Sequence, residues 1–516
     1  MLGSRLLPLA IAALALGCGS SERGKPGAAA TPASPLGPVG EGRGLRVFSG
    51  PAVMLPDGPP CTAEEGAEGD RWCGFLATSS TGRDDLYVVN VSAVLAGVPV
   101  ACGEADPNCL LLAQEVVANG NSSRWIYFGG DTLVYYDATL VPRIWRPGME
   151  SGRMLAEVPA SADIVSCAPA GRGMAIACLE IPDVQADAGV FTAELHVGTA
   201  DAEGEPLLAP IDHVILGNNG TFAGVQRFYS SFPTDGYIAW SSPEDTASPD
   251  VLKLAQADDL ESTVTVTSDI QAWGVSPDAS RWHWVTPDGV LQTAPFPDGA
   301  QTTDLLSDVR DYGVSRSGGL VAMTASADLL SMLDPAGSPD APLLLDQGVQ
   351  ELLTLSAGDY VAYAKHILNK KTSDLFVANL DGRAPCTVEE TVKVPLSSLS
   401  VSKSGAALLW ALSTPDGYDA FHTNLADCRT TAVAPDVAVL GWIDDRTLVF
   451  VDDFDASTGS GSMRFRRTTP QGALDSATPV LIAEHVSTNA TTGSTLLYTV
   501  RAGDDDDGVY VRTFAR

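Results

Sequence analysis

The chain has 516 residues, of which 45% are apolar and 18% are charged, and its net charge is −33 at pH 7. A chain this acidic lacks the basic surface that displaces counterions from nucleic acid, so we expect no nucleic acid among its partners. The same charge opposes electrostatic docking onto anionic lipid. Its 50 glycines and 34 prolines separate short apolar runs, and this pattern favours an all-β fold.

The first 17 residues have the features of a secretory signal peptide. Arg5 supplies a positive charge, and the apolar run over 6–16 is too short to remain as a membrane span. The run ends in LGC, which resembles the lipobox of bacterial lipoproteins, and this resemblance implies that Cys18 carries a lipid. Because Gly19 rather than aspartate follows, the resemblance also implies the outer membrane, at its periplasmic face or at the cell surface. The alternative is an ordinary secretory signal, with Cys18 incidental.

Residues 18–44 are dominated by glycine, proline, alanine and serine and contain no strand or helix pattern. A segment of this composition cannot bury enough apolar surface to become ordered. We therefore expect a disordered tether between the lipid and a folded region over 45–516.

Eight cysteines remain after Cys18, an even number that predicts up to four disulfides in an exported chain. Metal ligation is the alternative, but the chain has no CxxC pair and we expect no metal site at these residues. Cys386 and Cys428 would join successive repeats if their Cα atoms lie within about 7 Å of each other. The spacing suggests Cys61 with Cys73, Cys102 with Cys109, Cys167 with Cys178, and Cys386 with Cys428.

One unit recurs through most of the chain: a polar turn, a short apolar strand, a second turn and a second strand. A recurrence of about 40–45 residues with four short strands in each period is typical of β-propeller blades. Each blade must stack on its neighbours to bury its two apolar faces. The expected turn positions are Ser276, Ser315, Ser356, Ser402, the neighbourhood of Asp444, and Ser487.

We therefore expect an all-β protein, a single β-propeller of four-stranded antiparallel blades over 45–516. The length allows up to ten units; we expect seven or eight blades and prefer eight. Two smaller stacked propellers are the alternative. Because an open sheet edge invites aggregation, we expect the first strand, 45–50, to complete or abut the blade formed by 508–516.

Three units resemble the WD40-like repeats of TolB-type propellers: 275–299, 355–382 and 401–427. Ser276, Pro277 and Asp278 match the start of that repeat, and Asp381 with Gly382 matches its end. The resemblance covers about a third of the chain and implies a propeller fold, whereas it implies little about function. TolB carries an additional α/β domain and prolyl peptidases a hydrolase domain, and we expect neither here.

The sequence contains no GxSxG elbow, no HExxH and no P-loop, so it offers no catalytic residues. His283 lies between Trp282 and Trp284, and we weigh ordinary aromatic packing against a sugar-binding platform. Asp504–Asp507 and a cluster of Asp452, Asp453 and Asp455 could ligate calcium through oxygen. Both lack the spacing of a calcium loop, so we expect no cofactor, with calcium as the alternative.

The expected function is that of a lipid-anchored envelope protein whose propeller is a non-catalytic scaffold. Its ligand would be another envelope protein, a peptide or a glycan, and we expect a monomer held to the membrane through its lipid anchor only. The alternative is a carbohydrate-active enzyme, a glycosidase or lyase that uses channel carboxylates. Acidic residues of raised pKa at the channel would favour the enzyme, and small or apolar lining residues the scaffold.

Overall fold

The computed structural model describes residues 44–514 with gaps, and residues 1–43, including the expected signal, Cys18 and nearly all of the tether, lie outside it. The described residues form 38 strands and one helix, α1 (Val91–Leu95). None of the described helices is long and apolar enough to cross a membrane. The gaps of four residues or more are 56–59, 63–69, 117–125, 155–162, 171–174, 182–190, 200–208, 217–236, 244–247, 334–341 and 394–397.

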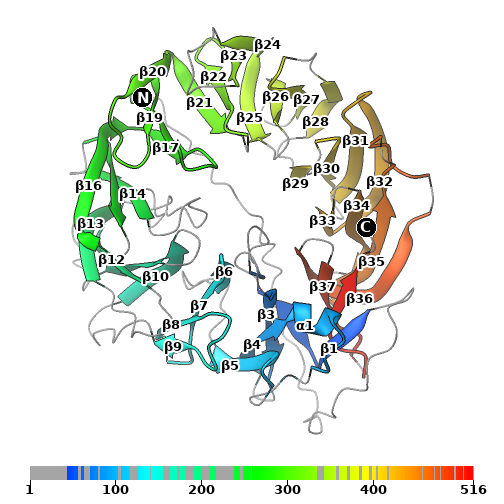
Figure 1. Ribbon diagram of the computed structural model, residues 1–516. Coiled ribbons are helices and arrows are strands. Elements are labelled where there is room, and N and C mark those ends of the chain that lie inside the picture. The colour runs from blue at the N-terminus through cyan, green and yellow to red at the C-terminus, as the bar shows by residue number, and fades with distance from the viewer. Residues whose placement is uncertain are drawn as a thin grey trace.

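The strands form antiparallel sheets that follow one another around a ring, and the first strand of each sheet lies at its inner edge (Figure 1). We number the sheets as blades in chain order. Blade 1 contains β2 (Ala52–Met54), β3 (Trp72–Thr78), β4 (Asp84–Asn90) and β5 (Cys109–Val116). Blade 2 contains β6 (Tyr127–Gly129), β7 (Thr132–Tyr136), β8 (Pro142–Trp145) and β9 (Arg153–Met154). Blade 3 contains β10 (Asp163–Ala170), β11 (Ala175–Ile181), β12 (Phe191–Thr199) and β13 (Ala209–Leu216).

The next five blades continue the same order, and blade 4 has three described strands. Blade 4 contains β14 (Tyr237–Pro243), β15 (Asp250–Gln256) and β16 (Asp259–Ile270). Blade 5 contains β17 (Ala272–Val275), β18 (Arg281–Val285), β19 (Leu291–Pro295) and β20 (Thr303–Leu306). Blade 6 contains β21 (Val309–Val314), β22 (Leu320–Thr324), β23 (Asp328–Met332) and β24 (Leu343–Gln347). Blade 7 contains β25 (Val349–Leu355), β26 (Tyr360–Leu368), β27 (Thr372–Asn379) and β28 (Cys386–Lys393). Blade 8 contains β29 (Ser398–Val401), β30 (Ala407–Ser413), β31 (Tyr418–Asn424) and β32 (Arg429–Val437).

The last sheet has seven strands because two blades share the long strand β36. Its first half pairs with β35, and its second half, from Val486 onward, pairs with β37. The sheet therefore supplies blades 9 and 10. Its strands are β33 (Val439–Trp442), β34 (Thr447–Asp455), β35 (Ser460–Arg467), β36 (Val480–Thr492), β37 (Thr495–Val500), β38 (Gly508–Thr513) and β1 (Leu45–Ser49).

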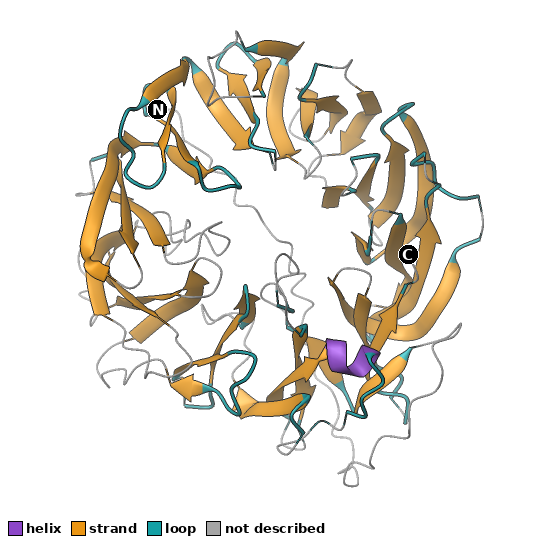
Figure 2. Ribbon diagram, viewed as in Figure 1, coloured by secondary structure: helices purple, strands orange, loops and turns teal. Residues whose placement is uncertain are grey.

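The all-β propeller fold with four-stranded antiparallel blades is confirmed, but the preferred number of eight blades is wrong. The described strands make ten blades in a single ring, so two stacked propellers are also excluded (Figure 2). The early segments, which lack the polar turn that marks the later repeats, each form a sheet of their own rather than a half-blade or an insertion.

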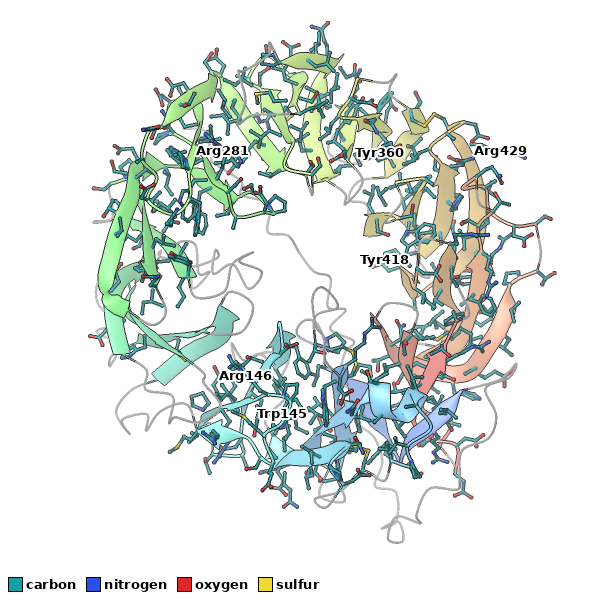
Figure 3. The ribbon with its side chains drawn as sticks, in the orientation of Figure 1. Trp145, Arg146, Arg281, Tyr360, Tyr418 and Arg429 are labelled. Atoms are coloured by element: carbon teal, nitrogen blue, oxygen red, sulfur yellow. A yellow bond between two sulfur atoms is a disulfide. The ribbon has the colours of Figure 1, made fainter. Side chains whose placement is uncertain are left out.

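The packing explains why the second strand of a blade is a continuous apolar run. Strand β22 is buried at every position, and so is β37, because neighbouring blades cover both of their faces. Aromatic rings also pack between blades: Trp145 of blade 2 meets Trp72 of blade 1 edge-on, with ring centroids 5.1 Å apart. Figure 3 labels Trp145 among the side chains of blade 2. Burial of such large rings stabilises each joint between blades.

The repeat turns lie where the sequence predicts them at four positions. The backbone N–H groups of Ser276, Ser315 and Ser402 each donate across the turn between the first and second strands of a blade, at 2.9, 2.7 and 2.9 Å. Asp444 lies in the turn between β33 and β34, where the backbone N–H of Ile443 donates to the carbonyl oxygen of Thr447 at 2.9 Å. Ser487 was expected at such a turn and lies instead inside β36, because this strand runs without a break from blade 9 into blade 10. Ser356 lies outside the described residues.

The ring closes through its first strand, as predicted. Strand β1 pairs antiparallel with β38, so Leu45 lies opposite Val511 and Ser49 opposite Gly508. Val47 is buried at this joint, with 2% of its surface exposed. The first strand thus forms the outer edge of blade 10.

Candidate functional site

Disulfides join three of the four expected cysteine pairs: Cys61–Cys73, Cys102–Cys109 and Cys386–Cys428. Cys178 is also disulfide-bonded, and Cys167 lies directly opposite it in the register of β10 and β11. Because disulfides persist where thiols are not kept reduced, these bonds indicate an oxidising, extracytoplasmic environment.

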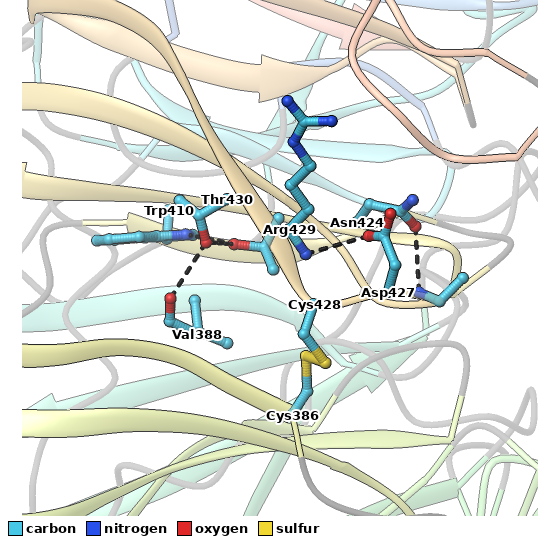
Figure 4. Close-up of a disulfide and its surroundings, with 10 residues drawn as sticks. Cys386, Val388, Trp410, Asn424, Asp427, Cys428, Arg429 and Thr430 are labelled. Atoms are coloured by element: carbon cyan, nitrogen blue, oxygen red, sulfur yellow. Dashed lines mark hydrogen bonds between the residues drawn. A yellow bond between two sulfur atoms is a disulfide. The ribbon is translucent and has the colours of Figure 1, made fainter.

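The bond between Cys386 and Cys428 crosses from blade 7 to blade 8, with the Cα atoms 5.6 Å apart (Figure 4). Beside it, the Thr430 hydroxyl donates to the carbonyl oxygen of Val388 at 3.1 Å. This hydrogen bond also joins blade 8 to blade 7. The two contacts fix the outer edges of these blades to each other.

The sugar-platform hypothesis for Trp282 and Trp284 is wrong. Both indole rings are fully buried, and their N–H groups donate to the carbonyl oxygen of Pro297 and to Gln292 Oε1 at 2.9 and 2.7 Å. His283 faces away from them and is itself buried, and neither ring nitrogen has a hydrogen-bond partner. Trp282, His283 and Trp284 are therefore part of the hydrophobic core, and none of their ring faces is open to a ligand.

Three side chains of the two acidic clusters accept hydrogen bonds from protein atoms, and Asp504 lies outside the described residues. Asp452 accepts a hydrogen bond from Arg464 Nε at 2.9 Å, and Asp455 accepts from the hydroxyl and backbone N–H of Ser457. Asp507 accepts from the backbone N–H of Gly503 at 2.8 Å. Among the residues that the structure describes, no group of three or more metal-binding side chains converges.

The inner edge of the ring carries a cluster that sequence reasoning missed, on the first strands of blades 6 and 7. In β21 the strand register shifts after buried Val309, and in β25 it shifts after buried Val349. Each shift is a bulge that leaves one residue unpaired, and such bulges re-aim neighbouring side chains. The residues at and after the two bulges, which we call the inner-edge cluster, are Arg310, Asp311, Gln350 and Glu351.

The two carboxyl groups of the inner-edge cluster have raised pKa values. Asp311 is exposed, yet the protein around its carboxyl removes part of the surrounding solvent and raises its pKa. The pKa of Glu351 is raised first by its own partial burial and then by the negative charge of Asp311, while Arg310 acts in the opposite direction. The carboxyl groups of neighbouring blades are therefore electrostatically coupled, and both stay partly accessible.

Two other blades lack an acidic residue at the position of Asp311. The residue of blade 5 that corresponds to Asp311, four positions before its repeat-turn serine, is Ala272. Blade 10 has the same kind of bulge after buried Val486, and Thr488 stands at the corresponding place. Aligning the strands before the repeat turns, rather than the turns themselves, would have revealed the two adjacent acidic residues in the sequence.

No family model matches the chain, and no curated protein matches it. Among solved structures it is similar to TolB from Acinetobacter baumannii, at 12% identity over 55% of this chain and 78% of that chain, with a TM-score of 0.27. A prolyl endopeptidase structure is 12% identical over 72% of this chain and 53% of that chain, with a TM-score of 0.36. A eukaryotic initiation factor is 10% identical over 85% of this chain and 98% of that chain, with a TM-score of 0.37. At these identities the likeness concerns fold alone, and the fold stated above rests on the strand order of this chain.

Proposed function

We propose that this chain is an outer-membrane lipoprotein, attached through Cys18, whose propeller binds a basic segment of another envelope protein without catalysing a reaction. The observation that carries the proposal is the pair of accessible, coupled carboxyl groups of Asp311 and Glu351 on the inner edge of the ring, in a chain whose net charge is −33. A cationic peptide would neutralise both groups and be drawn in by the charge of the whole protein.

Fluorescence anisotropy tests the binding role, with a labelled lysine- and arginine-rich peptide titrated against the full chain. The double variant Asp311→Asn, Glu351→Gln should weaken binding, and added salt should reduce the difference from the unmodified protein. The matched control is Asp304→Asn with Asp436→Asn, which removes the same charge from exposed positions on outer strands. An equal loss in both double variants would show that net charge alone, rather than the inner-edge cluster, attracts the peptide.

The raised pKa values of the same two residues meet the criterion given above for an enzyme, so a glycosidase or lyase is the second candidate function. Binding is placed first because the sequence contains no catalytic motif. Paired carboxyl groups of different proton affinity are the machinery of glycoside hydrolysis, in which one group protonates the leaving oxygen. Turnover of an envelope glycan that disappears in Glu351→Gln and in Asp311→Asn, with a pH optimum on the acidic side of neutrality, would establish this alternative and overturn the binding role.

The anchor has its own test in cells. Palmitate should label the mature protein, and Cys18→Ser should abolish the label and release the protein from the membrane fraction. Unchanged membrane association of an unlabelled protein would contradict lipid attachment.

A further inference from the structure

An apolar loop projects beside the joint that closes the ring. After β4 the chain forms α1 and then continues through residues 96–100, and we call residues 91–100 the seam loop. Leu95 to Pro99 are exposed in succession, and none of them carries a charge. Leu95 and Val98 expose 37% and 39% of their surface. Exposed apolar surface commonly marks a contact site.

The seam loop is held firmly at its base. Asn90 caps α1 by accepting a hydrogen bond from the backbone N–H of Ala93 at 2.9 Å. Val91 and Val94 are buried in a core that also contains Val509 of β38. The loop therefore presents its apolar tip outward while its inner face is fully used in packing.

The cysteines tie this loop to the strand that closes the ring. Cys102, just after the loop, is bonded to Cys109, and its sulfur lies 3.2 Å from the carbonyl oxygen of Val47 in β1. Val100 packs against the same core as Leu45, the first residue of β1. Figure 1 shows α1 over this joint, on the side of the ring opposite to β24. The apolar tip thus lies beside the point at which the described chain begins.

The chain that precedes this point determines what the tip can reach. The disordered tether expected over residues 18–44 would have a root-mean-square span of about 30 Å. A lipid on Cys18 would therefore keep the seam loop within reach of the bilayer. Most other exposed surfaces of this acidic protein would be repelled by anionic headgroups, whereas an uncharged tip would not.

We propose that the seam loop rests on the lipid bilayer, with Leu95 and Val98 in the interfacial region, and so holds the ring in one orientation. This inference rests on the proposed lipid anchor and adds to it a second, protein-borne contact. A lipid chain and a shallow apolar contact together fix an orientation that a flexible tether alone leaves free.

Tryptophan quenching tests the contact. The full-length lipidated protein carrying Val98→Trp is reconstituted into phosphatidylcholine vesicles that contain brominated lipid, and the quenching of the unsubstituted protein is subtracted. We expect additional quenching for Val98→Trp, and its loss when Leu95→Asp is added. The matched control is Leu344→Trp, on β24 across the ring, whose parent side chain is 49% exposed and apolar; it should show no additional quenching.

The outcomes separate this inference from the proposed function. Quenching of Val98→Trp no greater than that of Leu344→Trp, in a protein that carries the palmitate label, would overturn the bilayer contact and leave the anchor intact. Absence of the label on Cys18 would overturn both. Quenching that is lost when a soluble envelope extract is added would assign the loop to a protein partner and also overturn the bilayer contact.

Discussion

Cys386 at the start of β28 is bonded to Cys428 in the turn before β32, and this bond joins blades 7 and 8 across a sequence separation of 42 residues. The bond between Cys102 and Cys109 spans a separation of only 7 residues within blade 1. The two bonds therefore constrain the unfolded chain to very different degrees.

Replacing both residues of the long-range bond, as Cys386→Ser with Cys428→Ser, should lower the free energy of unfolding by about 4 kcal/mol on the chain-entropy model, against about 2.5 kcal/mol for Cys102→Ser with Cys109→Ser. Thermal unfolding followed by circular dichroism checks the order of the two effects. A larger fall in Tm for the short bond would show that native packing, rather than loop length, sets the contribution of these disulfides.

The closure strand offers a second test through Val47, which is buried between β38 and blade 1. Val47→Asp places an unpaired carboxylate in this core, so we expect a loss of several kcal/mol and an early, separate unfolding of the joint. Val480→Asp is the matched control, because Val480 is 46% exposed on β36 and the substitution there should change Tm little. Equal falls in Tm for Val47→Asp and Val480→Asp would mean that the joint between β1 and β38 is not needed for stability.

Acid should weaken the ring through His283 and His422. Burial is the main cause that lowers the pKa of each to about 4, from 6.5. As pH falls below 6.5, these histidines bind protons in the unfolded chain but stay neutral in the folded chain. The free energy of unfolding should therefore fall towards pH 4, by up to about 3 kcal/mol per histidine.

Tm measured between pH 4 and 7 checks this slope. His283→Leu should reduce the slope of Tm against pH and should lower the stability little near pH 7, because neither ring nitrogen of His283 has a hydrogen-bond partner. The exposed His485 provides the control, since His485→Asn should keep the full slope. A slope that is unchanged in His283→Leu would place the acid sensitivity elsewhere.

Asp346 of blade 6 joins blade 7 through a half-buried polar contact. It accepts from the Tyr363 hydroxyl at 2.7 Å and from Lys365 Nζ at 3.0 Å. Burial acts to raise the pKa of this carboxyl, but the two hydrogen bonds outweigh it and the pKa is lowered. Asp346→Asn should therefore cost about 2 kcal/mol at neutral pH.

Chemical denaturation at two pH values measures this cost. Because the folded pKa is lowered, the stabilisation is complete above the unfolded value of 3.8, and the variant and the unmodified protein should converge as pH falls below it. Glu115→Gln, in the exposed pair with Arg83, should have no measurable effect. If Asp346→Asn still lowers the free energy of unfolding well below pH 3, the loss would come from altered packing rather than from removal of the negative charge.

Much of the fold could be predicted from local pattern. Turns such as those at Ser276 and Ser402 are determined by a few neighbouring residues, and the closure by β1 follows from the need to cover a sheet edge. The blade number could not be predicted in the same way. It depends on whether weakly patterned segments, such as β6 to β9, stack as sheets, and contacts with neighbouring blades decide that outcome.

The inner-edge cluster shows a different limit. Asp311 and Glu351 are 40 positions apart in the sequence, and each alone is one acidic residue among 64. The stacking of β21 beside β25 brings Asp311 close enough to add to the rise in the pKa of Glu351, which burial begins, and the pKa of Asp311 is raised by desolvation of its own carboxyl group. The burial of Trp282 and Trp284 was equally hidden, because an alternating strand pattern does not reveal whether its outer face meets solvent or the next blade.

The pairing of Leu45 with Val511 also governs the order in which the ring can fold. Strand β1 has no partner until β38 has formed, so the blades between them must be in place before the ring closes. Until then the unpaired edges of β1 and β38 remain open to pairing with other chains.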